Sequence, residues 1–112
     1  MNPVTTKHEL EARLSRHRDE IRQLGVQRLG LFGSFRHDKA NKDSDIDFIV
    51  HFRRGEKTYL NLFELSELLE QILGRRIELI TPDSLSEPLR QQILQDVEYV
   101  QEPDDLHRPH SR

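Results

Sequence analysis

The segment that most constrains the fold of this chain covers residues 29–52, where two apolar stretches flank a polar connection. The first stretch ends in Gly33 and Ser34, and the second opens with two acidic residues, Asp45 and Asp47. The pattern predicts two strands joined by a turn. Because side chains alternate between the faces of a strand, both aspartates project from one face. Carboxylates so placed repel each other unless a divalent cation lies between them, so we interpret the pair as a metal site.

The turn at Gly33 and Ser34 has the properties of a phosphate-binding site. Glycine lets the backbone come close to a ligand, and the N–H groups that open a following helical turn attract phosphate oxygens. We therefore expect the backbone of this turn and the Ser34 hydroxyl to hold the β- and γ-phosphates of a nucleotide. A phosphate site beside metal-binding carboxylates is the combination that nucleotidyl transfer requires.

A third acidic residue, Glu78, lies in a later apolar segment that predicts a strand. If the three strands form one sheet, Glu78 converges with Asp45 and Asp47 near the Gly-Ser turn. We predict that the three carboxylates hold two divalent metal ions and that Glu78 reaches the acceptor hydroxyl, directly or through a metal. A Gly-Ser pair or an Asp-x-Asp pair is common alone, but ten residues separate Ser34 from Asp45 with strands on both sides, which makes the combination specific.

The composition of the 112 residues limits the classes of protein that fit. The net charge is −3 and the sequence pI is near 6.1, so no strong nucleic-acid footprint is expected. The chain has no cysteine, which excludes disulfides, thiolate metal ligands and a cysteine nucleophile. It shows neither a signal peptide nor an apolar run of about 18 residues, so we expect a cytoplasmic protein without a membrane span.

Hydrophobic periodicity predicts an α+β domain over residues 6–100, with a small mixed sheet and helices packed mainly on one face in the order α-β-α-β-α-β-α. The predicted helices cover residues 6–24, 35–40, 58–73 and 86–97, and the predicted strands cover 26–32, 45–52 and 75–80. Residues 101–112 are polar and contain proline, so we interpret them as a mobile tail. The apolar arc of residues 60–73 is wider than a core-facing side requires; core packing explains most of it, and a partner-binding or dimer face is the alternative.

The sequence LFGSF, followed by DSDIDFIV and GRRIELITPDSL, resembles the minimal nucleotidyltransferases of the DNA-polymerase-β-like superfamily. The likeness covers roughly residues 8–100, and the family pattern of Gly-Ser, ten residues and Asp-x-Asp matches without gaps. Within the superfamily, the chain is most similar to the MNT-domain antitoxins encoded beside HEPN-domain ribonuclease toxins. The resemblance implies the nucleotidyltransferase fold and the transfer of AMP from ATP, with magnesium, to a hydroxyl of the toxin, typically a tyrosine, which silences the toxin.

Two positions depart from the family pattern. The third acid is usually aspartate and here is Glu78, and the usual arginine three residues after the serine is replaced by His37, which follows Arg36. Arg36 is the candidate for the phosphate contact, and a solvent-exposed basic residue is the alternative. A second interpretation of the whole chain is therefore a binding protein that neutralises its toxin by contact, with weak or no catalysis.

The length of the chain bears on where the acceptor comes from. Building the sheet leaves almost no surface to hold both base and acceptor, so the acceptor must come from another protein or another copy of this chain. Transfer to a small-molecule alcohol such as an aminoglycoside is a weaker alternative, because no substrate-binding domain is present. We place His51, Arg53 and Arg54 outside the site, since they lie at the far end of the second strand.

Overall fold

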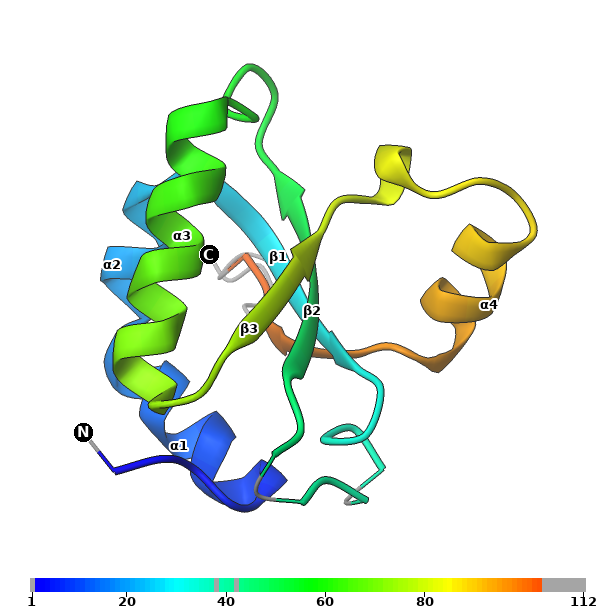
Figure 1. Ribbon diagram of the computed structural model, residues 1–112. Helices are drawn as coiled ribbons and strands as arrows, with labels where there is room; N and C mark the ends of the chain where they lie inside the picture. The colour runs from blue at the N-terminus through cyan, green and yellow to red at the C-terminus, as the bar shows by residue number, and fades with distance from the viewer. Residues whose placement is uncertain (1, 38, 42, 104–112) are drawn as a thin grey trace, which may run out of the picture.

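One mixed four-stranded sheet organises the computed structural model, which describes residues 2–37, 39–41 and 43–103. The strands are β1 Val26–Phe32, β2 Ile46–Phe52, β3 Ile77–Ile80 and β4 Glu98–Gln101. They lie in the order β3-β2-β1-β4; β1 is antiparallel to both β2 and β4, whereas β2 and β3 are parallel. A parallel pair needs a crossover, and a long helix between β2 and β3 supplies it (Figure 1).

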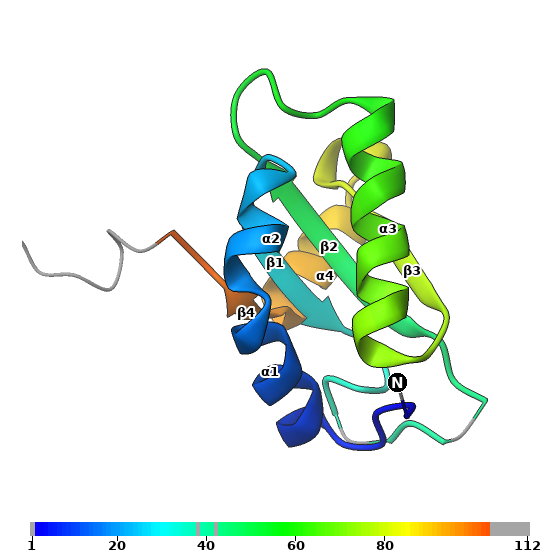
Figure 2. The same cartoon turned by 90° about the vertical axis from the view of Figure 1, so that its left-hand side faces the viewer.

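The helices lie mainly on one face of this sheet. They are α1 Lys7–Arg16, α2 Arg18–Gln23, α3 Tyr59–Leu73 and α4 Leu89–Asp96, with a short 3₁₀ turn at Pro82–Ser84. Helices α1, α2 and α3 cover one face, and α4 lies on the opposite side (Figures 1 and 2). The predicted fold class, α+β with a small mixed sheet and helices mainly on one face, is confirmed. In the described part of the chain, none of these helices combines the length and apolarity needed to cross a membrane.

Alternation along β2 places the core on one face of the strand. Ile46, Phe48 and Val50 are fully buried, as predicted for the core-facing side chains of this segment. They pack with the apolar side chains of the three covering helices, which include Leu10, Leu14, Ile21, Leu65, Leu69 and Ile72. The side chains that alternate with them belong to the other face, where the predicted carboxylates lie.

Capping at both ends fixes α3 where the sequence predicts it. The Thr58 side chain accepts a hydrogen bond from the Asn61 N–H at 3.1 Å, and Gly74 ends the helix in the left-handed region at φ 69°. The end of α3 leads directly into β3, so these caps also set the position of the strand that carries Glu78.

Three predicted elements differ from the structure. The helix expected over residues 6–24 breaks at His17, which caps both α1 and α2 with φ −117° and ψ 20°. Residues 35–37 form a turn rather than a helix, because the His37 and Lys39 N–H groups both donate to the Ser34 carbonyl at 3.2 and 2.8 Å. The predicted order lacked β4, whose last residue, Gln101, was assigned to the tail; residues 104–112 of that tail lie outside the described residues.

Candidate active site

The register of β2 brings the Gly-Ser turn and two of the predicted carboxylates together. Asp47 is the partner of Phe32 on β1 and of Glu78 on β3. Gly33 follows Phe32 directly, so the turn lies on one side of Asp47 and the third acid lies on the other. This arrangement matches the convergence that the sequence predicts.

Gly33 lies against the carboxylate of Asp47. Its φ of +77° is in the left-handed region, and a Cβ added there would lie 2.2 Å from Oδ2 of Asp47. Any side chain at this position would therefore collide with the carboxylate and strain the backbone. The close approach leaves the turn backbone and an acidic oxygen next to each other, as a metal-bound triphosphate requires.

Negative charge is concentrated at this end of the sheet. Burial, and then the charges of Glu78 and Asp45, together raise the pKa of the Asp47 carboxyl to about 6. Asp45 has a partner, because the Arg76 Nε lies 3.3 Å from its Oδ1, but the Arg76 side chain is 82% exposed. An exposed guanidinium neutralises a carboxylate weakly, so the cluster retains a strong attraction for cations.

The donor set fits a magnesium ion that arrives with its nucleotide. Within the described residues, no group of three or more histidine, cysteine or acidic side chains is already arranged to hold a metal. Magnesium, however, is usually held by one or two carboxylates together with substrate phosphates and water. Asp47 provides one such carboxylate beside the Gly-Ser turn, and Asp45 is near enough for its charge to raise the pKa of Asp47. These two side chains could hold a metal–nucleotide complex, but they do not form a complete metal cage.

The two basic residues after Ser34 are engaged by the C-terminal part of the chain. The Arg36 Nε donates to the carbonyl of Asp96 at 2.9 Å, and its Nη1 lies 3.5 Å from Glu98 Oε1. His37 Nε2 lies 2.8 Å from a carboxylate oxygen of Asp96. The predicted contact between Arg36 and a phosphate stays a prediction, and these interactions would have to rearrange or be shared for it to form.

Arg75 holds the loop between Ser34 and Asp45, a role that sequence reasoning missed. Its guanidinium donates to the backbone carbonyls of Val4, Asn41 and Ser44. It also lies over the ring of Phe35, 4.9 Å from the ring centroid. These contacts join segments 31 to 71 residues apart, so no local pattern could reveal them. The position of Arg76 near the acidic residues, by contrast, could be predicted from the sequence. It lies two residues before Glu78, and residues two apart in an extended segment project to the same side.

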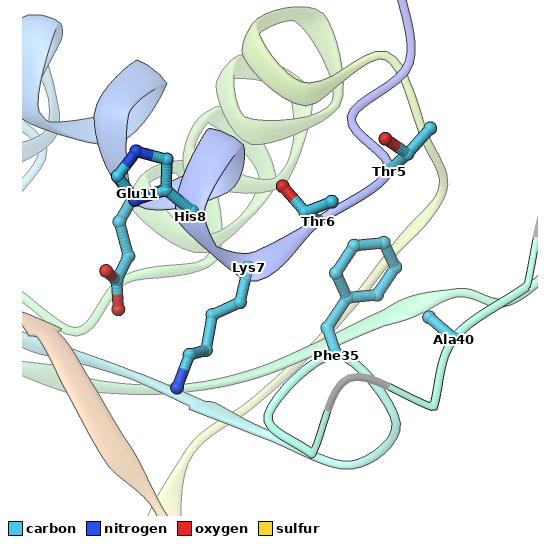
Figure 3. Close-up of a pocket in the computed structure, with 7 residues that line it drawn as sticks. All are labelled: Thr5, Thr6, Lys7, His8, Glu11, Phe35 and Ala40. Carbon is cyan, nitrogen blue, oxygen red and sulfur yellow. The ribbon is translucent and has the colours of Figure 1, made fainter.

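A cavity of about 530 Å³ lies beside the loop that follows the Gly-Ser turn (Figure 3). The start of α1 and this loop line it with Thr5, Thr6, Lys7, His8, Glu11, Phe35 and Ala40. Lys7 donates to Glu98 Oε1 at 2.8 Å, the same oxygen that Arg36 approaches. Two cationic side chains therefore meet on one carboxylate near the turn, and the sequence pattern did not indicate that Lys7 would be one of them.

The opposite end of β2 is separate from this site, as predicted. His51 Nε2 lies 2.9 Å from the Tyr99 hydroxyl, and the Arg53 guanidinium donates to the carbonyls of Val26 and Arg22 at 3.2 and 3.1 Å. These contacts tie β2 to its neighbours and involve none of the predicted site residues.

Comparison with known proteins places the chain in a family. The nucleotidyltransferase domain model matches residues 14–100, which is most of the chain. The chain belongs to the nucleotidyltransferase domain family. The resemblance seen in the sequence is thereby confirmed, and the Gly-Ser turn, both aspartates and Glu78 all lie within the matched residues.

Relatives and solved structures narrow the family further. The protein adenylyltransferase MntA of Thermococcus cleftensis is 38% identical over 98 residues, which cover 87% of this chain and 98% of that protein. A solved structure of a proposed minimal nucleotidyltransferase has a TM-score of 0.74 at 31% identity and covers 83% of this chain and 94% of its own. A crystal structure of a toxin–antitoxin with AMP-PNP has a TM-score of 0.65 at 25% identity, with 85% and 75% covered.

Proposed function

We propose that this chain is an antitoxin that transfers AMP from ATP to a hydroxyl of a HEPN-domain toxin in the cytoplasm. The observation that carries the proposal is the contact of Gly33 with Asp47, which has Glu78 on its other side. The likeness to a protein adenylyltransferase and to a toxin–antitoxin with AMP-PNP supports the reaction, the nucleotide and the class of partner. The HEPN class follows from the family resemblance of the sequence.

The nucleotide would bind where the turn meets the carboxylates. The backbone at Gly33 and the hydroxyl of Ser34 would hold the β- and γ-phosphates, because a glycine without a side chain leaves its backbone accessible to a ligand. Asp45 and Asp47 would hold magnesium, and two ions are proposed as in the sequence-based hypothesis. A metal ion held there would act as a Lewis acid and would offset the negative charge of the phosphates.

In the proposed reaction, the oxygen of the acceptor hydroxyl forms a bond to the α-phosphorus of ATP. The bond between the α-phosphorus and the bridging oxygen breaks, and pyrophosphate leaves with that electron pair. The hydroxyl proton passes to the carboxylate of Glu78, which is exposed on β3 and lies opposite Asp47. A tyrosine is the proposed acceptor, as the family resemblance of the sequence implies.

A second candidate function is neutralisation by binding alone. It is favoured by Glu78 in place of the usual aspartate and by the lack, within the described ranges, of three acidic or histidine side chains arranged around a metal position. The extra methylene of glutamate displaces the carboxylate, and a displacement of about 1 Å can lower a rate about 100-fold.

Co-expression with the neighbouring HEPN toxin separates the two candidates. We expect wild-type chain to restore growth of cells that express the toxin, and the Asp45→Asn, Asp47→Asn variant to form the complex without restoring growth. Pull-down of the toxin from the same cultures checks that the complex forms. Full neutralisation by the variant would support binding alone and reject the enzymatic proposal.

A further inference from the structure

The start of α3 carries an apolar surface that the candidate active site does not use. Among the described residues, three of the four exposed large hydrophobic side chains belong to α3: Tyr59 is 91%, Leu60 62% and Phe63 61% exposed. Tyr59 and Phe63 are four positions apart and therefore lie on the same side of the helix. Leaving two aromatic side chains in water on one side of a helix is unfavourable, so this side is a candidate for contact with another molecule.

This side of α3 faces a groove shared with the sheet. The groove encloses about 240 Å³ and is lined by Tyr59, Leu62, Phe63 and Ser66 of α3 together with Leu79 of β3. In the described part of the sheet, β3 is an edge strand, paired with β2 on one side only. An apolar groove at a sheet edge offers both side-chain contacts and free backbone groups to a docking partner.

The charge around the groove argues against a second copy of this chain as the occupant. Helix α3 contains three glutamates and neither lysine nor arginine. Glu70 is used internally, since its Oε2 accepts from the Ile77 N–H at 3.2 Å, whereas Glu64 and Glu67 are exposed. Two copies packed through α3 would bring these glutamates together, and like charges across an interface disfavour the pairing. The complementary occupant has an apolar ridge bordered by lysine or arginine.

The groove is also placed to serve the transfer reaction. Leu79 directly follows Glu78, the carboxylate that lies opposite Asp47. Because the two residues project from opposite faces of β3, a partner that straddles this edge contacts the groove and presents a hydroxyl to the site. Docking and acceptor delivery would then use the two faces of one short strand.

We propose that the toxin docks here, on the surface formed by Tyr59, Leu62, Phe63 and Leu79, with Glu64 and Glu67 facing basic side chains of the toxin. The identity of this partner rests on the proposed function, but the docking surface does not depend on catalysis. The apolar side chains hold the complex together, and the glutamates select the partner by charge.

The test uses the purified full chain and the HEPN-domain toxin proposed as its partner. A Tyr59→Ser, Phe63→Ser variant changes only exposed side chains, and Leu89→Ser, which is 45% exposed on α4, is the matched control. We expect the double variant to raise the Kd for the toxin about 100-fold, because two aromatic contacts are lost, and the control to change it less than about twofold. Reversal of Glu64 and Glu67 to lysine should also raise the Kd, most strongly at low salt.

Each outcome decides the proposal separately from the proposed function. Toxin binding that is weakened in the double variant supports the docking surface even if the wild type transfers no AMP, in which case the enzymatic function fails alone. Unchanged toxin binding in the double variant overturns the docking surface. Self-association of the wild type that is lost in the double variant without toxin overturns it too, in favour of a second copy. A wild type that binds no toxin rejects both the surface and its partner.

Discussion

The face of the sheet opposite α1 to α3 carries charged groups at both ends. The two ends differ in how far these charges are balanced by partners within the protein. At one end, the Arg28 guanidinium lies 3.8 Å from the centroid of the Tyr99 ring and 3.2 Å from a carboxylate oxygen of Glu102. At the other end, Asp47 has Glu78 and Asp45 as acidic neighbours, and the Arg76 side chain is mostly in solvent. Charge is balanced within the protein at the first end and left in excess at the second.

The protonation equilibria follow this difference. Burial, and then the charge of Arg28, lowers the pKa of His51, so the ring is neutral and its bond to Tyr99 needs no counter-ion. Burial also disfavours the charged form of Asp47, but its neighbours Glu78 and Asp45 carry the same sign. A stable fold keeps such a repulsion where a ligand of opposite charge relieves it. The comparison is consistent with a structural role for the His51 end and supports the binding role proposed for the Asp47 end.

The largest expected effect is the loss of AMP transfer when the negative charges of Asp45 and Asp47 are removed. In the Asp45→Asn, Asp47→Asn variant, we expect the rate of pyrophosphate release in the presence of toxin to fall about 1,000-fold or more, because several kcal/mol of metal-assisted stabilisation are lost. His51→Gln, at the balanced end, serves as the control and should change the rate less than about threefold. Equal losses in both variants would erase the distinction between the ends.

The second effect concerns the close approach of the turn to Asp47. Gly33→Ala places a Cβ 2.2 Å from Asp47 Oδ2 at a φ of +77°, whereas Gly55→Ala meets nothing within 4 Å at a φ of +81°. Both changes strain the backbone by about 1 kcal/mol, but only Gly33→Ala should also displace the carboxylate, with a total cost of about 2–4 kcal/mol and a large loss of transfer. Urea unfolding of the two variants measures the difference, and similar unfolding free energies would show that the contact with Asp47 is unimportant.

A smaller effect is expected in the pH dependence of stability. The pKa of Asp47 is about 6 in the folded chain and 3.8 for the unperturbed group, so the folded state binds more protons between these values. The unfolding free energy contributed by Asp47 therefore falls as pH rises from about 4 to about 6 and stays level above that. After allowance for solvent screening, this amounts to about 1 kcal/mol. The contribution of Asp47 is isolated by comparing the unfolding free energies of wild type and Asp47→Asn over this pH range. The variant should gain stability relative to wild type as pH rises. A difference that does not change with pH would contradict the raised pKa.

The smallest effect is expected at the balanced end. Tyr99→Phe removes the hydroxyl that lies 2.9 Å from His51 Nε2 but keeps the ring beneath Arg28. Thermal unfolding should show a loss of about 0.5–1 kcal/mol, the usual value of one partly exposed hydrogen bond, with transfer unchanged. A large loss of transfer in this variant would extend the functional region across the whole face.

Local sequence patterns were sufficient to predict the two faces of β2 and the limits of α3. The alternation along β2 separated Ile46 and Phe48 from Asp47, because a strand permits only two side-chain directions. The Thr58 cap and the terminal Gly74 predicted the limits of α3 for equally local reasons. Convergence of Glu78 with Asp47 required one further assumption, that the strands share a sheet, and their register bears it out.

The remaining features depend on contacts that are distant in sequence. Strand β4 has only four residues and is recognisable only through its pairing with β1. The segment after Ser34 has helical composition, but its N–H groups turn back to the Ser34 carbonyl. Arg75 holds the following loop through the Ser44 carbonyl and joins it to the N-terminal segment through the Val4 carbonyl. The helix break at His17 could not be predicted either, because neither glycine nor proline lies next to it in the sequence. At β4 and in the loop after Ser34, tertiary contacts outweighed local propensity.

The measurement that tests the central claim most directly is the transfer of label from ATP to the purified toxin with magnesium. Parallel reactions would use ATP labelled at the α-phosphate or at the γ-phosphate, with wild-type chain and with the Asp45→Asn, Asp47→Asn variant. The account predicts that the toxin acquires the α-label from the wild type only, and the γ-label from neither. Label from the γ-phosphate, or an intact complex in which the toxin remains unlabelled, would contradict it.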